Sequence, residues 1–403
     1  MGAEHVGAGA PTDAVGGAVP RWMVRPGNVA QVQEVVTEAA RARVALAATG
    51  LGAHLELGAA PQRVDVLIRM DRLCRVLDHQ VGDMTVTVEA GCPLSVLEDA
   101  LARGGQWLPL DPPHLERTTV GGLIATNLAG PLRSSQGLVR DFLLGVKVVH
   151  ADGALVSGGG RVVKNVAGYD LPKLHIGALG TLGVIVEASF KVCPRPAYEE
   201  AILIQGLSVE EASALGFSVL DSAAAPLWLE ILGPEELTLA IGLGGVHEEI
   251  EAARARIAEL AARHRTTWRA TGDGERARRE LVARVASGVA ALRMGVLPAD
   301  VPAGLARLHQ LAKENEMILR YTATLAAGSV RIGILGRGRV DALVDGLRPW
   351  AAARGGVVVL ERGHPAECDP WGRITSGLAL MRGVKLAFDP HGVFAAGRFV
   401  GGL

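Results

Sequence analysis

The chain has 403 residues, which is long enough for two domains that each bury a core of their own. Its 41 basic and 42 acidic residues give a net charge of −1, and only 4% of the residues are aromatic. This composition argues against a surface for nucleic acid or for an anionic membrane. No uninterrupted run of 18 apolar residues occurs, so the sequence predicts no membrane-spanning helix.

The first 20 residues are small, rich in glycine and alanine, and lack a basic segment. We therefore expect a mobile leader at 1–20 and no secretory signal. The four cysteines, Cys74, Cys92, Cys193 and Cys368, lie far apart and form no CxxC pair. This spacing indicates neither a disulfide framework nor an iron–sulfur cluster, and it favours a reducing cytoplasm.

Residues 21–197 alternate predicted helices and strands. Asn28 is a suitable N-cap for a helix with apolar residues at helical spacing, and Pro93 begins a second helix that ends before Gly104. The alternation of apolar and polar residues at 84–90 predicts a half-buried strand. An Asp-Gly turn at 152–153 predicts a hairpin. The strands expected in this part are 44–47, 84–90, 145–150, 154–157 and 184–192.

The pattern changes after Pro194 and Pro196, where we place a domain boundary. The following residues repeat a β-α-β-β-α-β order, and Ser208 and Glu211 have the spacing of a capping box. We expect an antiparallel sheet with helices on one face. Its expected strands are 201–206, 226–232, 237–243, 289–296, 317–325 and 329–335, and its expected helices are one from 208, 246–264 and 299–315. A last helix is expected at about 372–388.

Three segments rich in glycine or threonine are candidate ligand loops: 49–54, 118–127 and 158–185. Glycine lets the backbone approach a ligand closely, and exposed amide N–H groups can bind phosphate or a heterocycle. Glycines also mark bulges and close strand packing, so the spacing alone leaves both interpretations open. The first loop lacks a complete GxGxxG and gives little support to a Rossmann fold. Three separate loops favour one long ligand, and FAD meets that requirement.

Six segments together resemble the FAD-binding domain of the vanillyl-alcohol oxidase/p-cresol methylhydroxylase (PCMH-type) superfamily, and most closely the smaller flavin subunits of bacterial glycolate oxidases. They are VEAGCPLSVLEDAL, GGQWLPLDPP, TTVGGLIATNLAGPLR, GLVRDFLLGVKVV, GGRVVKNVAGYDLPKL and GALGTLGVI. The match covers about 24–196 and resumes at 371–403. It implies an α+β fold with a PCMH-type FAD-binding domain of two subdomains at 21–197, a cap or substrate domain at 198–370, and a C-terminal segment at 371–403 that packs on the FAD domain.

The resemblance also implies how non-covalent FAD would be held. Backbone N–H groups of the first two loops would bind the pyrophosphate, and the third loop would contact adenine or the ring edge. A cation near the flavin ring would stabilise its reduced form, and Arg398 is the candidate. The expected cofactor residues are Thr49, Gly50, Leu51, Gly52, Ala53, His54, Pro112, Thr118, Thr119, Gly121, Gly122, Ala125, Thr126, Asn127, Arg140, Asp141, Asn165, Gly180, Gly183, Val184, Ile185 and Arg398.

Tyr169 and Arg398 are the candidate catalytic residues. Tyr169 would stack on the cofactor or hydrogen-bond to it, or else pack as a structural residue. Asn165 is either catalytic, together with Lys164, or part of a turn. The histidine that links flavin covalently in some superfamily members would stand at Ala53, so we expect no covalent link through His54.

The chain also departs from the family pattern. No histidine-rich GDGN-type motif occurs in the cap, where Gly274 is followed by Glu275 and Arg276. Ala395-Ala396 replaces the usual Asn-Pro, and Thr49 stands where an arginine is usual. These departures put independent oxidation of glycolate in doubt.

The resulting functional expectation is an FAD-dependent oxidoreductase acting on CH–OH groups, as the smaller flavin subunit of a glycolate (2-hydroxy acid) oxidase. Its expected partners are a larger flavin subunit, an iron–sulfur subunit that receives the electrons, and a small 2-hydroxy acid, with no metal and no nucleic acid. The expected location is the cytoplasm, with membrane contact only through partners at the inner face of the plasma membrane. The alternatives are a stand-alone FAD-linked dehydrogenase of another hydroxy acid or alcohol, and a non-catalytic flavin subunit.

Overall fold

The computed structural model describes residues 1–403 except 161–168, 337, 364–367 and 373–375. The fold is mixed α+β, as the sequence predicts. The chain divides into two compact units. Unit 1 comprises Met1–Leu128, Leu138–Arg195 and Arg373–Leu403, and unit 2 comprises Ala129–Gly137 and Pro196–Gly372.

The first sheet of unit 1 has the strand order β1-β2-β4-β3, in which β2, β4 and β3 run parallel. Asn28 caps helix α1, because its side chain accepts a hydrogen bond from the amide of Gln31. The apolar face of α1 packs with the sheet through Val32 and Val36. The bounds are β1 (Val6–Ala8), β2 (Trp22–Val24), α1 (Val29–Ala42), β3 (Leu46–Thr49) and β4 (Val66–Arg69).

The N-terminal 20 residues, expected as a mobile leader, have a defined place on this sheet. Strand β1 pairs antiparallel with β2, with Val6 opposite Val24. Val15 is fully buried, and the buried carboxylate of Asp13 accepts a hydrogen bond from the amide of Ala10. Backbone pairing and apolar burial hold this segment on unit 1. The composition, rich in glycine and alanine, gave no sign of these contacts.

The second sheet of unit 1 is antiparallel, with the order β5-β6-β10-β8-β9. Strand β6 was expected to be half-buried, and this was wrong, because both of its faces are covered. Its polar residues are satisfied inside: Thr87 hydrogen-bonds to Ser189, and Glu89 pairs with Arg75. The bounds are β5 (Val76–Gln80), β6 (Thr85–Glu89), α2 (Leu94–Ala102), β7 (Gln106–Trp107), α3 (Val120–Thr126), α4 (Val139–Phe142), β8 (Leu143–Val149), β9 (Leu155–Gly159), α5 (Pro172–His175), β10 (Val184–Lys191) and β11 (Cys193–Pro194).

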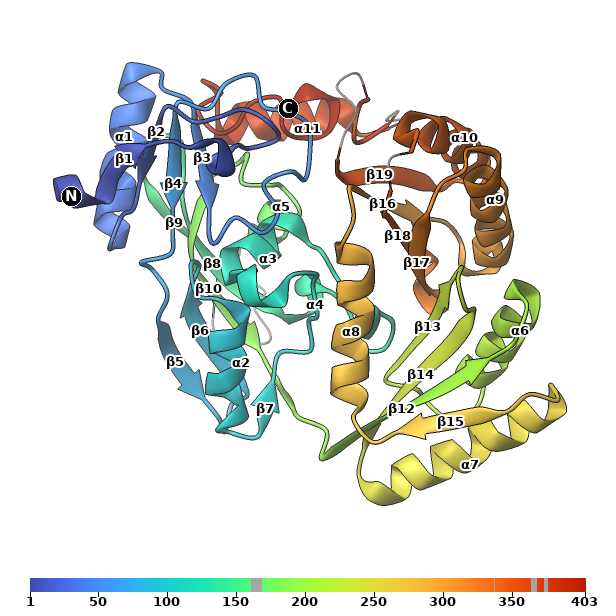
Figure 1. Ribbon diagram of the computed structural model, residues 1–403. Coiled ribbons are helices and arrows are strands. Elements are labelled where there is room, and N and C mark those ends of the chain that lie inside the picture. The colour runs from blue at the N-terminus through green and yellow to red at the C-terminus, as the bar shows by residue number, and fades with distance from the viewer. Residues whose placement is uncertain (161–168, 337, 364–367, 373–375) are drawn as a thin grey trace. The chain divides into compact units, whose positions relative to one another are not determined.

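The end of the chain returns to unit 1. After helix α11 (Leu378–Phe388), the backbone runs beside β3, where the amide of Leu46 donates to Val393 and the amide of Ala395 donates to Leu46. Phe394 is buried in the core of the first sheet. The C-terminal segment therefore completes that sheet edge (Figure 1).

Unit 2 is built on one eight-stranded antiparallel sheet with the order β15-β12-β14-β13-β17-β18-β16-β19 (Figure 1). Two consecutive β-α-β-β-α-β repeats form its halves and meet where β13 pairs with β17. The strands are β12 (Tyr198–Gln205), β13 (Trp228–Gly233), β14 (Thr238–Gly245), β15 (Trp268–Thr271), β16 (Ala290–Gly295), β17 (Leu319–Thr324), β18 (Ser329–Ile334) and β19 (Val357–Arg362).

The two faces of this sheet differ in chemistry. One face packs on α6 (Val209–Leu220), α7 (His247–Arg263), α9 (Val301–Glu314) and α10 (Val340–Ala352) around a large apolar core. Ser208 and Glu211 form the predicted capping box of α6. The other face carries polar side chains beneath α8 (Gly274–Ala286) and the short 3-10 helix η4 (Pro131–Ser134).

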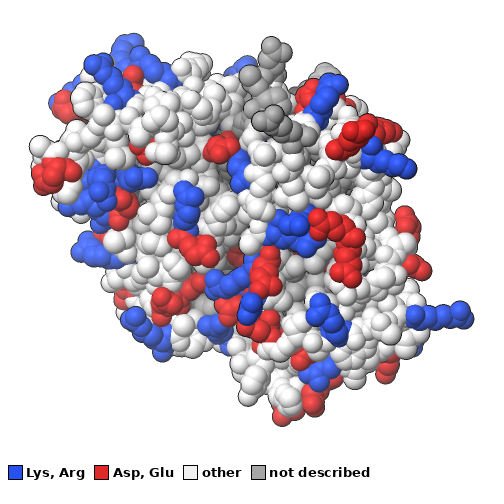
Figure 2. Space-filling view, viewed as in Figure 1, with Lys and Arg blue, Asp and Glu red and all other residues white. Residues whose placement is uncertain are grey.

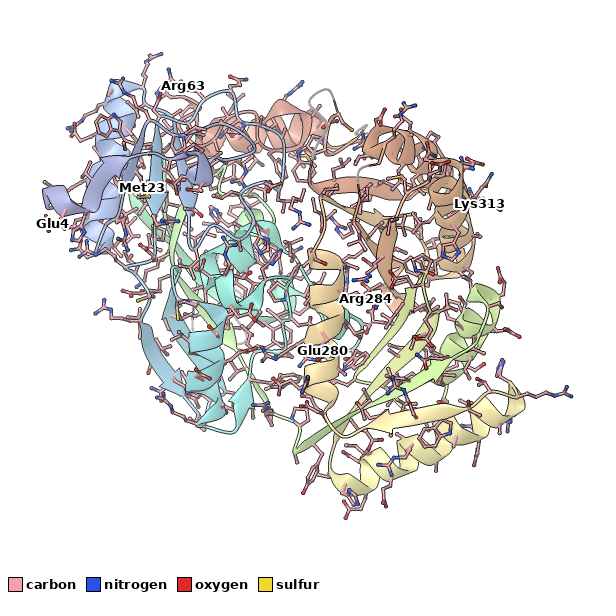
Figure 3. All side chains as sticks on the ribbon, in the orientation of Figure 1. Glu4, Met23, Arg63, Glu280, Arg284 and Lys313 are labelled. Atoms are coloured by element: carbon pink, nitrogen blue, oxygen red, sulfur yellow. The ribbon has the colours of Figure 1, made fainter. Side chains whose placement is uncertain are left out.

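The surface shows no broad region of one charge on the face drawn in Figure 2, where acidic and basic side chains are interspersed. Exposed charged residues such as Lys313 on α9 and Glu280 on α8 extend away from the ribbon (Figure 3). Among the described helices, none is long and apolar enough to span a bilayer.

Candidate cofactor site

Unit 1 contains a groove of about 690 Å³ at the three predicted glycine loops. Sixteen of the expected cofactor residues line it: Thr49, Gly50, Leu51, Gly52, Ala53, His54, Thr118, Thr119, Gly121, Gly122, Ala125, Thr126, Gly180, Gly183, Ile185 and Arg398. The fold thus brings together three loops that lie far apart in the sequence.

The first loop follows β3 and exposes a row of backbone donors. Among the described residues, none accepts a hydrogen bond from the amides of Gly50, Leu51, Gly52 or Ala53. A side chain at Gly50 would meet the second loop, because its Cβ would lie 2.2 Å from Oγ1 of Thr119. Gly52 has a φ of +76°, which L side chains rarely adopt. Close packing and backbone conformation thus explain both glycines, and the amides are available to an anion.

The second loop begins at Thr118 and enters α3. Thr119 caps this helix by accepting a hydrogen bond from the amide of Gly122 at 3.3 Å. Oγ1 of Thr118 lies 3.0 Å from the carbonyl oxygen of His114 and 2.9 Å from Nε2 of His54. Since a hydroxyl has a single proton, Thr118 donates to the carbonyl and accepts from Nε2–H of His54. His54 thereby connects the first loop to the second.

The third loop is attached to α3 and to the C-terminal segment. The amides of Gly177 and Leu179 donate to Ile124 and Ala125, each at 2.9 Å. Within the described part of the chain, the amides of Gly180 and Gly183 have no acceptor. Gly180 has a φ of +74°, and a Cβ there would have no neighbour within 4 Å. A side chain at this position would therefore point into open space at the groove.

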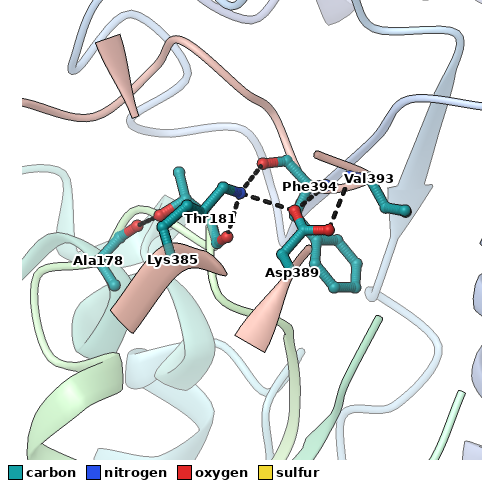
Figure 4. A network of polar contacts seen from close by, with 6 residues as sticks. All are labelled: Ala178, Thr181, Lys385, Asp389, Val393 and Phe394. Carbon is teal, nitrogen blue, oxygen red and sulfur yellow. Dashed lines mark hydrogen bonds and ion pairs between the residues drawn. The ribbon is translucent and has the colours of Figure 1, made fainter. Parts of the chain in front are cut away.

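Lys385 fixes the third loop through a hydrogen bond to the backbone of Thr181, as Figure 4 shows. Its Nζ donates to the carbonyl oxygen of Thr181 at 2.7 Å, to Oδ2 of Asp389 at 2.7 Å and to the carbonyl oxygen of Phe394 at 3.0 Å. The Asp389 carboxylate also accepts from the amides of Val393 and Phe394. Burial lowers the pKa of Lys385, and the carboxylate of Asp389 partly offsets that effect.

Arg398 joins the first loop to the third. Its guanidinium donates to the carbonyl oxygens of His54, Leu55 and Leu57, at 3.2–3.3 Å, and of Leu179 at 3.4 Å. The side chain is buried, and burial lowers its pKa to about 10, so it remains charged at neutral pH. A buried cation is therefore part of the groove wall.

Five of the remaining expected cofactor residues are described, and none of these five lines the groove. Asp141 accepts a hydrogen bond from the amide of Leu138, and Arg140 is exposed. Asn127 ends α3 in a left-handed conformation. Pro112 and Val184 are buried, and Asn165 lies outside the described residues, as does Lys164. Direct contact of these residues with a cofactor stays a prediction.

The two candidate catalytic residues, Arg398 and Tyr169, differ in their position relative to the groove. Arg398 is in the groove wall, whereas the side chain of Tyr169 is 91% exposed and next to the undescribed segment 161–168.

Six lining residues were not anticipated from the sequence: Ala48, Leu55, Met70, Ala90, Arg117 and Leu179. Arg117 directly precedes Thr118, and its Nη2 lies 3.5 Å from the carbonyl oxygen of Leu51. Its position directly before the second loop in the sequence was the signal that could have identified it as a lining residue.

The charge distribution of the groove fits an anionic cofactor. Its lining includes the cations Arg117 and Arg398, and none of the described lining residues is acidic. Unpaired amides add partial positive charge at fixed positions. The pyrophosphate of FAD matches this chemistry. Elsewhere in the described residues, no group of three or more His, Cys, Asp or Glu side chains is placed to hold a metal ion.

Comparisons with known proteins agree with the geometry of the groove. Residues 20–159 match the sequence model of the family described as FAD binding domain. Over 180 residues, the chain is 39% identical to the glycolate oxidase subunit GlcE of Escherichia coli, covering 44% of this chain and 50% of that protein. Over 215 residues, it is 28% identical to the glycolate oxidase subunit GlcD of Bacillus subtilis, covering 53% of this chain and 46% of that protein.

A third relative is the D-2-hydroxyglutarate dehydrogenase of Xanthomonas citri pv. viticola, which is 35% identical over 185 residues, covering 46% of this chain and 39% of that protein. The matches thus span half or less of these curated relatives. Among solved structures, an alkyldihydroxyacetonephosphate synthase aligns over 94% of this chain and 77% of its own, with a TM-score of 0.72 and 17% identity, which shows a shared fold. Over residues 20–159 the chain is therefore similar to the FAD binding domain family.

Proposed function

We propose that the chain binds FAD non-covalently and acts as an FAD-dependent oxidoreductase of small 2-hydroxy acids. The observation that carries this proposal is the groove of unit 1, where unpaired backbone amides and a buried arginine meet in a wall without described carboxylates. The match of residues 20–159 to the FAD binding domain family supports the choice of FAD over other anionic cofactors.

Each loop has a task in this proposal. Bound FAD supplies the two-electron acceptor for oxidation of a CH–OH group. The amides of Gly50–Ala53 and Thr119 bind the pyrophosphate through fixed dipoles. Gly180 and Gly183 leave space for a flat ring. Arg398 and Lys385 hold the loops in position through hydrogen bonds to their carbonyl oxygens. Ala53 carries no nucleophilic side chain, so FAD is held without a covalent bond at that position.

The finer proposal is that the chain is the smaller flavin subunit of a glycolate oxidase-like complex. It rests on the relatives named as glycolate oxidase subunits, GlcE and GlcD. In that setting the chain would act with a larger flavin subunit and pass electrons to an iron–sulfur partner. The likeness to D-2-hydroxyglutarate dehydrogenase favours a second candidate, a dehydrogenase that acts without those partners.

One experiment separates these candidates. The FAD-loaded chain is incubated with an artificial electron acceptor and a panel of 2-hydroxy acids, first alone and then with the proteins that co-purify with it. Turnover only in the presence of a co-purifying iron–sulfur protein supports the subunit, and turnover by the chain alone supports the stand-alone dehydrogenase. Stable FAD binding with no turnover in either condition would contradict both and indicate a non-catalytic flavin subunit.

A further inference from the structure

The polar face of the unit 2 sheet carries a row of buried side chains that the flavin site does not use. Glu230 on β13 lies opposite Thr324 on β17, and Thr322 lies opposite Arg331 on β18. Arg331 in turn lies opposite Arg293 on β16. Since directly paired residues and residues two apart share a face of a sheet, all five belong to one face.

A cavity of about 320 Å³ lies over this row. Strands β13, β17 and β18 contribute Glu230, Thr322, Thr324, Ser329 and Arg331 to its lining. Helix α8, which Figure 3 identifies by Glu280 and Arg284, contributes apolar side chains such as Leu281. The segment Ala129–Gly137, which belongs to unit 2, contributes Arg133. Apolar walls with a few convergent polar groups are typical of a small-molecule site.

The carboxylates in this row already have partners. Glu361 on β19 lies 3.0 Å from Nε of Arg293 and 3.5 Å from Nη2 of Arg331, both measured to its Oε1. Oε1 of Glu230 accepts a hydrogen bond of 2.6 Å from the hydroxyl of Thr324. Glu361 therefore serves two arginines through a single oxygen.

Arg133 has weaker contacts than the other arginines. In the described part of the chain, its recorded hydrogen bond is to Oγ of Ser329 at 3.5 Å, which is the long limit for such a bond. Burial lowers the pKa of Arg133, and repulsion from Arg293 and Arg331 lowers it further. A guanidinium has five N–H donors, so most of the hydrogen-bonding capacity of Arg133 is not used by this contact. The planar arrangement of these donors matches the two oxygens of a carboxylate.

The groups that interact electrostatically with Arg133 are two arginines, Arg293 and Arg331, and two glutamates, Glu230 and Glu361. We propose that Arg133 and Arg331 bind the carboxylate of a small organic acid in this cavity, with the hydroxyls of Thr322 and Ser329 as further polar contacts. A bound carboxylate would offset the repulsion among the three arginines. This site concerns binding within unit 2 and does not depend on the proposed oxidation.

Isothermal titration calorimetry on the FAD-loaded full chain tests the site, with glycolate, acetate, glycolamide and inorganic phosphate as probes. Glycolate and acetate are expected to bind, and glycolamide, which has no charge, is expected to bind at least tenfold more weakly. Arg133→Gln and Arg331→Gln should each weaken glycolate binding by roughly tenfold or more, because a charge-assisted bidentate contact is lost. Arg339→Gln, at an exposed arginine of unit 2 that pairs with Asp341, should leave binding unchanged.

Arg133→Lys keeps the charge and loses the planar fork, so it is expected to fold normally and to bind with intermediate affinity. The proposal is overturned if acetate and glycolate do not bind, if only phosphate binds, or if Arg133→Lys and Arg133→Gln both bind glycolate as the unaltered chain does. A chain that oxidises no 2-hydroxy acid but shows the expected arginine dependence of binding would contradict the proposed function and support this site.

Discussion

Replacing Lys385 by methionine tests the buried contact that fixes the third loop. The change removes three hydrogen bonds from Nζ and leaves the Asp389 carboxylate, which is 2% exposed, without its counter-charge. Removing one partner of a buried ion pair costs about 3–5 kcal/mol. We therefore expect Lys385→Met to lower the free energy of unfolding of unit 1 by about 3–5 kcal/mol. That is a large share of the roughly 5–15 kcal/mol typical of a whole domain.

The assay is urea unfolding followed by circular dichroism, together with the release of FAD. Lys147→Met is the matched control, because Lys147 pairs with Glu187 at 3.0 Å in the same unit but is 41% exposed. An exposed pair contributes at most about 1 kcal/mol, so the control should unfold nearly as the unaltered chain does. A loss below about 1 kcal/mol for Lys385→Met, equal to that of the control, would refute the structural role given to this lysine.

Three further changes test the groove and its surroundings. Gly180→Ala should weaken FAD binding by roughly 5- to 150-fold, since an added methyl group in a filled site costs about 1–3 kcal/mol; equilibrium titration measures it. Gly105→Ala is the control, with the same open space at Cβ and a φ of +65°, and it should leave FAD affinity unchanged. Arg398→Lys should weaken FAD binding as well, because an ammonium cannot serve carbonyls on two loops as a planar guanidinium does, and the same titration detects this. Burial, reinforced by His150, lowers the pKa of His175 to about 4, so between pH 6.5 and 4 this histidine takes up a proton in the unfolded chain but not in the folded chain. The free energy of unfolding should therefore be roughly 2 kcal/mol lower at pH 5 than at pH 7. His175→Gln should remove this dependence of stability on pH.

Different results would contradict each expectation. Equal FAD affinity in the two alanine variants would mean that the groove at Gly180 does not hold the cofactor. Full affinity in Arg398→Lys would mean that the two loops keep their positions without the guanidinium. An unchanged pH slope in His175→Gln would assign acid sensitivity to other groups.

The sequence predicted elements well where a local signal was strong. Asn28 caps α1, and the Ser208 capping box begins α6, because caps are decided by neighbouring residues. Strand β3 lies two residues later than expected, since Arg43 ends α1 in a left-handed conformation and the amide of Val44 still bonds to Ala39. Helix α8 was missed because few of its residues are apolar and buried, among them Leu281 and Val285.

The residues of the groove could likewise be predicted only where the local sequence carried a signal. The glycine-rich loops were visible in the sequence because close backbone approach, as at Gly50 beside Thr119, requires glycine. Met70 and Ala90 could not be found in this way, since they come from other parts of the chain and only tertiary packing brings them to the groove. Arg140 and Asp141 were expected there from the family resemblance alone; neither lines the groove, and their contact with a cofactor stays a prediction.

The most direct test of the central claim is the flavin content of the chain after reconstitution with FAD and removal of unbound cofactor. The account predicts one FAD per chain by visible absorbance, and its complete release into the supernatant when the protein is precipitated with acid. FAD that stays with the precipitated protein would contradict non-covalent binding. A chain that retains no flavin at all would contradict the assignment of the groove formed by the Thr49, Thr118 and Gly180 loops.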